Sequence, residues 1–185
     1  MKSIPYIVDY APLIKGLLLA VLMVFALKND IKNYRIPNKL NLLFLLAGLV
    51  LNIVIGSVKS SFGGIVFPLI LFPLFALRMM GAGDIKLFCA MGAIVGFPQI
   101  INIMAYSIVF NGVIAVFLIF IRKECNGFAR LWQYLRYIFI TGKLTEYQTL
   151  DRDNKNIFRY AYGIALGCAY YIVTSLILGG SYALL

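Results

Sequence analysis

The middle of the chain carries the stretch Gly81-Ala82-Gly83-Asp84-Ile85-Lys86, in which a carboxylate interrupts a strongly apolar sequence. One uncharged run ends shortly before it, and a second extends from 87 to 121. An acid inside or at the border of a membrane costs about 2.5–3.5 kcal/mol on insertion scales, which makes it a candidate functional residue. Asp30 occupies a comparable position at the end of the first apolar run. Any chemistry that uses two carboxylates requires these two acids to meet.

The composition is that of an integral membrane protein. Hydrophobic residues make up 62% of the chain and charged residues only 13%, whereas soluble domains carry about 25% charged residues. The net charge of +10 comes from short basic clusters between apolar runs. This pattern favours the anionic headgroups of the inner leaflet over nucleic acid as partners. We therefore predict an all-α polytopic membrane protein that forms a single domain over 1–185.

The residue types that are missing limit the chemistry. The chain has no His, which excludes Ser-His and Cys-His nucleophile pairs and His-based metal sites. Its cysteines, Cys89, Cys125 and Cys168, are far apart and form no Cys-x-x-Cys pair, so we expect neither a metal site nor a disulfide. Carboxylates remain as the natural acid–base groups, and they need no cofactor.

Six apolar segments are candidates for membrane spans, each of which needs about 20 residues. The run from 87 to 121 would be about 52 Å long as one helix at 1.5 Å per residue. It must therefore fold back, and Gly96-Phe97-Pro98-Gln99 provides the turn. The segment before this turn is short, so we expect it to begin at or before Asp84 and to hold Asp84 in its first turn. The first predicted span lacks a signal-peptide cleavage pattern, and the third contains Pro68 and Pro73. The six predicted spans are Ala11–Leu27, Leu40–Val58, Ser61–Leu77, 85–96, 100–121 and Tyr160–Leu178.

The basic residues indicate how these spans are oriented. Fourteen of the 17 Lys and Arg residues lie on one side of the predicted membrane. The positive-inside rule then places both termini outside the inner membrane and the loops of Asp30 and Asp84 in the cytoplasm. The connection over 122–159 has apolar residues at helical spacing and a basic face, which predicts an amphipathic helix on the inner leaflet. A role in gating substrate is the alternative for this connection.

Two carboxylates on one face of a membrane suit an aspartyl hydrolase. Carboxyl groups a few ångströms apart share one proton, because both cannot be ionised at once. The ionised member activates water, and the neutral member stabilises the oxyanion. Asp30 would lie at the negative end of one helix and Asp84 at the positive end of another. Helix dipoles therefore favour Asp84 as the ionised base and Asp30 as the protonated acid.

The residues around the two acids fit this chemistry. Gly81 and Gly83 let the backbone leave helical geometry and allow an extended peptide to approach, although a loop or a close helix contact also accounts for them. Lys86 is expected either to tune the pKa of Asp84 or to bind a lipid headgroup.

The connection after the first span adds a second motif. Asp30 is followed by Arg35-Ile36-Pro37-Asn38, where Pro37 ends a helix and Asn38 can cap the next one. In a polytopic chain this motif and Gly81–Lys86 together resemble the Gly-x-Gly-Asp aspartyl peptidases that process type IV prepilins. The chain is similar to the small, single-domain prepilin peptidases of the tight-adherence (Flp) pilus type.

The resemblance extends to the last span. Tyr162-Gly163-Ile164-Ala165-Leu166-Gly167 is similar to the family's final span, whose small residues pack closely against other helices. Ala161 stands where a proline is often found, which is a departure from the family pattern. The spacing of Gly163 and Gly167 serves packing within a monomer as readily as between monomers, so the oligomeric state stays open.

The resemblance implies an aspartic endopeptidase that cuts the basic leader from a prepilin-like substrate at the cytoplasmic border of the membrane. It implies two catalytic residues, Asp30 and Asp84. Larger relatives carry an N-terminal domain with a cysteine-pair metal motif and also methylate the new N-terminus. Nothing similar precedes Asp30, so cleavage without N-methylation is implied.

The alternative is a non-enzymatic six-span transporter or assembly scaffold whose two acids bind an ion or pair with lysines. The residues expected to shape the site are Gly81, Gly83, Lys86, Arg35, Pro37 and Asn38.

Overall fold

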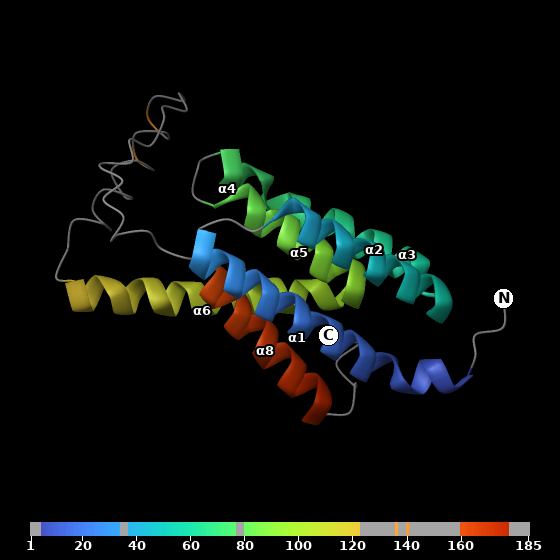
Figure 1. Ribbon diagram of the computed structural model, residues 1–185. Helices are drawn as coiled ribbons and strands as arrows, with labels where there is room; N and C mark the ends of the chain where they lie inside the picture. Colours follow the sequence, from blue (N-terminus) through green and yellow to red (C-terminus); the bar gives the residue numbers. More distant parts are fainter. Residues whose placement is uncertain are drawn as a thin grey trace.

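The computed structural model describes residues 5–33, 37–76, 80–122, 136, 140 and 160–177, and all of its elements are helices. Figure 1 shows α2, α3 and α5 packed together, with α8 lying against α6 and α1. The helices are α1 (Pro5–Asn33), α2 (Asn38–Ile55), α3 (Val58–Val66), the 3₁₀ helix η1 (Phe67–Leu71), α4 (Phe72–Ala76), α5 (Ala82–Val95), α6 (Gln99–Arg122) and α8 (Tyr160–Ile177).

The all-α polytopic fold predicted from the sequence is confirmed. Within the described residues, five segments are long and apolar enough to cross a membrane: Tyr10–Lys32, Asn38–Ile55, Val58–Ala76, Gln99–Phe117 and Tyr160–Ile177. The third of these changes from α3 through η1 to α4 where its two prolines lie. The predicted amphipathic helix over 122–159 lies almost entirely outside the described residues.

The remaining predicted span differs from the others. It corresponds to α5, whose 14 residues give a length of about 21 Å at 1.5 Å per residue, short of the 30 Å hydrocarbon core. The structure therefore has five helices of spanning length in its described part and one short helix between them. This short helix carries Asp84 near its start.

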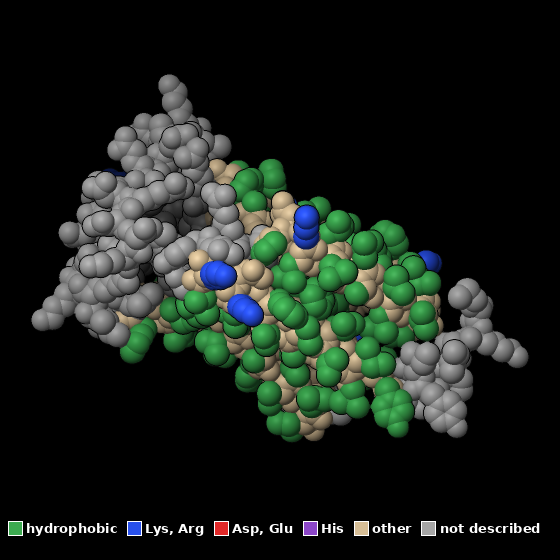
Figure 2. Space-filling view, in the orientation of Figure 1, with side chains coloured by type: hydrophobic (Ala, Val, Ile, Leu, Met, Phe, Trp, Pro, Cys, Tyr) green, Lys and Arg blue, Asp and Glu red, His purple; other side chains and the backbone are tan. Residues whose placement is uncertain are grey.

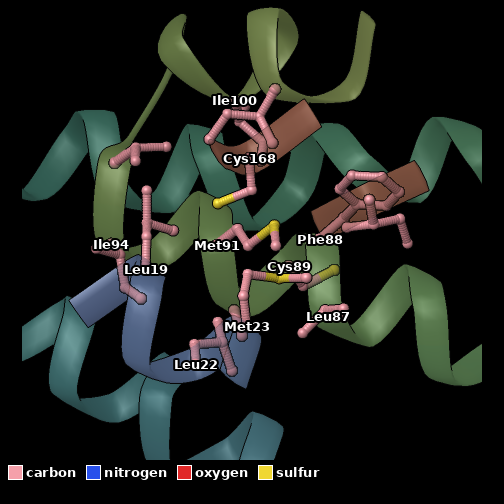
Figure 3. Packing of buried hydrophobic residues seen from close by; sticks show 14 of the residues in the cluster. Leu19, Leu22, Met23, Leu87, Phe88, Cys89, Met91, Ile94, Ile100 and Cys168 are labelled. Carbon is pink, nitrogen blue, oxygen red and sulfur yellow. The ribbon is translucent and has the colours of Figure 1, made fainter. Parts of the chain in front are cut away.

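The short helix α5 forms the centre of the molecule. Every residue from Leu87 to Val95 is buried. Figure 3 shows Met91 of α5 beside Cys168 of α8, and Ile94 of α5 beside Leu19 of α1. The outer helices instead expose many large hydrophobic side chains, and green apolar side chains dominate the described surface in Figure 2. This arrangement suits a bundle surrounded by lipid with α5 enclosed by protein.

Polar side chains from neighbouring helices hold the C-terminal end of α5. The Asn52 amide of α2 donates hydrogen bonds to the backbone oxygens of Ala93 (2.8 Å) and Ile94 (3.0 Å). The Ser61 hydroxyl of α3 donates to the same Ala93 oxygen at 2.7 Å. The last four carbonyl groups of a helix have no partner within it, and the bilayer core offers no water to replace one. These contacts explain how a helix too short to span can end inside the protein.

The turn that follows α5 is held in the same way. The Lys15 ammonium of α1 donates to the Val95 oxygen at 3.4 Å, and the Phe97 N–H donates to the Ser60 oxygen at 2.9 Å. Gly96 ends the helix with φ of 87°, in the left-handed region that glycine tolerates best. The turn predicted at residues 96–99 is thus confirmed.

Asn52→Leu is expected to lower the free energy of unfolding by about 1–3 kcal/mol, because it keeps the side-chain volume but leaves two buried backbone oxygens with one donor fewer each. Thermal unfolding in detergent measures the change. The matched control is Asn29→Leu, because among the described residues the Asn29 amide bonds within α1, to the Phe25 oxygen at 2.8 Å on an exposed face. Equal stabilities of the two variants would contradict the anchoring role of Asn52.

Candidate active site

Asp84 lies in the first turn of α5, as the sequence predicts. Gly81 is the N-cap residue of this helix. The Asp84 N–H donates to the Gly81 oxygen at 3.1 Å, and the Gly81 N–H donates in return to the Asp84 carboxylate. This reciprocal pair resembles a capping box, which satisfies backbone groups at the start of a helix. It fixes the direction in which the carboxylate of Asp84 points.

Asp30 lies in the last turn of α1, which ends at Asn33. It is partly buried, and its Oδ2 atom is fully buried. The negative charge of Asp30 acts directly on the carboxyl group of Asp84, and α1 packs against α5. The structure therefore brings together the two acids that the sequence singles out, one from the end of a helix and one from the start of another.

The pKa of the Asp84 carboxyl is raised from 3.8 to about 6, first by burial and second by the charge of Asp30. The hydrogen bond from the Gly81 N–H opposes this rise. The change corresponds to about 3 kcal/mol, whereas a helix dipole contributes about 0.3–1 kcal/mol at surface sites. Burial therefore opposes the helix dipole, which favours Asp84 as the ionised member, and it is the larger of the two effects on this carboxyl group.

Tyr160 is a third polar residue at the pair. It is the first residue of α8, and its hydroxyl interacts electrostatically with Asp84. Sequence reasoning missed it, although it begins the last apolar run on the side of the membrane where both acids were predicted. Its position follows from the packing of α8 against α1 and α6, which a single sequence does not reveal.

The first residue of α2 meets the start of α5 through a side-chain contact. The Lys86 ammonium donates to Oδ1 of Asn38 at 2.9 Å on an exposed face. Asn38 is not the cap that the sequence suggests: it is the first residue of α2, the N-cap is Pro37, and no side chain caps the helix. Arg35 lies outside the described residues. The contact between Lys86 and Asn38 links the start of α5 to the start of α2.

The two glycines differ in their surroundings. A Cβ atom added to Gly81 would lie 3.1 Å from Oδ2 of Asp84, so even alanine there would press on the carboxylate. The backbone of Gly81 is extended, with φ of −76° and ψ of 144°, and this conformation is open to any residue. Glycine is thus required at position 81 because a side chain would come too close to Asp84, and not because of the backbone conformation. Gly83 is partly buried within the first turn of α5.

Gly81→Ala is expected to lower peptidase activity about tenfold, since small displacements of a reacting group are costly, while membrane insertion stays normal. Initial rates at equal enzyme concentration in membranes measure the effect. Gly16→Ala in α1 is the control, because its added Cβ would meet only the Ile172 side chain at 3.7 Å, an ordinary contact. Full activity of Gly81→Ala would show that the close approach to Asp84 is unimportant.

Comparison with known proteins identifies the family. The model of the type IV leader peptidase family matches residues 17–116, which is more than half of the 185 residues. The predicted family resemblance is thus confirmed, and the matched range includes Asp30, Pro37 and Gly81–Lys86. No curated protein and no solved structure matches the chain. On the family match, this multi-pass membrane protein belongs to the type IV leader peptidase family.

Proposed function

We propose that the chain is an aspartic endopeptidase that removes the basic leader of a prepilin-like protein at the cytoplasmic border of the inner membrane. One observation carries the proposal: Asp30 and Asp84 interact electrostatically, and burial together with that interaction raises the pKa of Asp84 to about 6. Two carboxyl groups that hold one proton between them are the catalytic unit of aspartyl hydrolases.

The mechanism uses the two acids in different protonation states. Ionised Asp30 takes a proton from a water molecule while the water oxygen bonds to the scissile carbonyl carbon. Protonated Asp84 gives its proton to the carbonyl oxygen, which becomes a hydroxyl in the tetrahedral intermediate. When the intermediate collapses, the C–N bond breaks, the amine leaves with the proton held by Asp30, and the hydroxyl proton returns to Asp84. The pair is thereby restored without a metal or cofactor.

The position of the two acids at helix ends fits a substrate that is itself membrane-bound. Asp30 lies close to the end of the span Tyr10–Lys32, and Asp84 lies outside all five spans. The apolar segment of the substrate stays in the bilayer, and its leader reaches the pair as an extended strand. The positive-inside rule puts this site in the cytoplasm and both termini outside. Cleavage proceeds without N-methylation of the product.

Co-expression with a prepilin tests this function. The wild type is expected to shorten the prepilin on a gel and to leave a mature N-terminus whose mass is that of an unmethylated amine. Asp30→Asn should leave the prepilin uncut. The matched control is Asp9→Asn near the other end of α1, about 32 Å away at 1.5 Å per residue. Prepilin cleavage by Asp30→Asn, with normal membrane levels of both variants, would overturn the two-carboxylate mechanism and favour a non-enzymatic use of the acids.

A further inference from the structure

Tyr160 begins α8, and the packing of this helix fixes where its backbone lies. Gly163 and Gly167 follow it by three and seven residues, so all three lie on one face of α8. A Cβ atom on Gly163 would collide with the Asn111 amide of α6, and one on Gly167 would lie 2.5 Å from the Ser107 N atom. The two helices are therefore in close contact along this face. Tyr160 continues the face at its first turn.

The side chain of Tyr160 lies close to Asp84. The charge of Asp84 acts on the Tyr160 phenol. Tyr160 also lines the same cavity as Phe88, which follows Asp84 by four residues and so shares its face of α5. Tyr160 is partly buried at this place. A hydroxyl group thus lies within electrostatic range of the carboxyl group that we propose to be the acid.

Basic side chains near the pair are less suited than Tyr160 to meet a substrate at the two acids. The Lys86 ammonium donates to Oδ1 of Asn38 at 2.9 Å on an exposed face. Lys28 and Lys32, near the end of α1, are both exposed. Tyr160 combines a hydrogen-bond donor with partial burial beside the pair.

A phenol suits the charge that develops during peptide hydrolysis. The carbonyl oxygen gains negative charge as the water oxygen bonds to the carbonyl carbon. A phenol has an ordinary pKa of about 10, so it is a neutral hydrogen-bond donor at the pH at which the two acids share a proton. One donor directed at such an oxygen raises kcat by about 10²–10³-fold.

We propose that the Tyr160 hydroxyl donates a hydrogen bond to the oxygen of the scissile carbonyl, which makes Tyr160 a third catalytic residue. The inference rests on the proposed peptidase function. Asp84 still gives its proton to this oxygen. Tyr160 keeps its own proton and stabilises the negative charge until the transfer from Asp84 is complete.

Tyr160→Phe is expected to lower kcat by about 100-fold and to keep KM within about twofold, because the hydrogen bond strengthens in the transition state. Initial rates with purified enzyme and a synthetic prepilin measure both constants. The control is Tyr170→Phe, which removes the same oxygen at an exposed position of α8 and keeps the ring that contacts Tyr106. This variant should retain full kcat. An unchanged kcat in Tyr160→Phe, or a change in KM alone, would overturn the proposal and leave Tyr160 as an interfacial aromatic residue.

The pH profile shows whether the hydroxyl acts on the substrate or on Asp84. The pKa of Asp84, raised to about 6, sets the pH above which kcat/KM is expected to fall. Tyr160→Phe should leave this pH unchanged, because the lost hydrogen bond belongs to the substrate. A fall that begins at a higher pH in Tyr160→Phe would overturn the proposal, since it would show that Tyr160 stabilises ionised Asp84.

A transition-state analogue provides an independent measurement. A peptide with a hydroxyl-bearing tetrahedral carbon in place of the scissile carbonyl presents the oxygen that Tyr160 is proposed to contact. Its Ki should rise at least about tenfold in Tyr160→Phe and stay unchanged in Tyr170→Phe. Equal Ki values for the wild type and Tyr160→Phe would overturn the proposal. Failure of the peptidase function itself would be seen differently, as cleavage by Asp30→Asn.

Discussion

Asp84→Asn is expected to lower kcat/KM for leader cleavage by at least about 10³-fold, within the range lost when a general acid is removed. An amide cannot deliver the proton that the carbonyl oxygen needs, although it keeps nearly the same shape and can still accept the Gly81 N–H. Cleavage of a synthetic prepilin by purified enzyme measures the loss. Equal amounts of folded wild type and variant must be shown by gel filtration.

The same substitution is expected to stabilise the protein at pH 8. A folded-state pKa above the ordinary value means that ionised Asp84 destabilises the fold. This penalty is absent below pH 3.8, grows up to about pH 6 and is complete above it. Removing it should raise Tm at pH 8 by about 6–12 °C and leave Tm at pH 4 almost unchanged. A lower Tm for Asp84→Asn at pH 8 would show that the carboxylate is stabilising and that its pKa is not raised.

Cleavage by the wild type is expected to fall about tenfold for each pH unit above 6, so that kcat/KM at pH 8 is about 100-fold below its value at pH 6. The raised pKa of Asp84 means that the pair keeps its proton up to about pH 6. At higher pH both carboxyl groups are ionised, and no proton is left for the carbonyl oxygen. The profile of kcat/KM between pH 5 and 8 measures this loss.

A substrate without groups that titrate between pH 5 and 8 serves as the control for this profile, and Tm at each pH shows that the enzyme stays folded. A constant kcat/KM from pH 6 to 8 would mean that the acidic group in the reaction has a much higher pKa than Asp84. The protonation states proposed for the pair would then be wrong, while the loss of activity in Asp84→Asn would still stand.

The local features of the fold could be predicted because each depends on residues close in sequence. The turn at Gly96 follows from an uncharged run too long for one span, and the position of Asp84 in a first turn follows from the shortness of the segment behind it. The interaction of Asp30 with Asp84 was predicted only as a requirement of the chemistry. Whether the two acids meet in the folded protein depends on the packing of α1 against α5.

The features that were missed depend on tertiary structure. Asn111 is one polar residue within a long apolar run, and only the crossing of α6 and α8 shows that its amide packs against Gly163. The raised pKa of Asp84 could not be predicted for a related reason. A helix dipole can be read from sequence, whereas burial, the largest cause of the shift, depends on what surrounds the carboxyl group.

The anchoring of α5 has a consequence for biosynthesis. Among the residues that the structure describes, the side chains that bind its terminal carbonyl groups, Lys15, Asn52 and Ser61, all precede α5 in the chain. A ribosome therefore delivers the donors before the helix that needs them. When α5 leaves the translocation machinery, the side chains that bind its terminal carbonyl groups are already present. These carbonyl groups can then form hydrogen bonds without being exposed to lipid. The order of synthesis, with the donors first and α5 second, thus matches what the hydrogen bonds of the folded protein require.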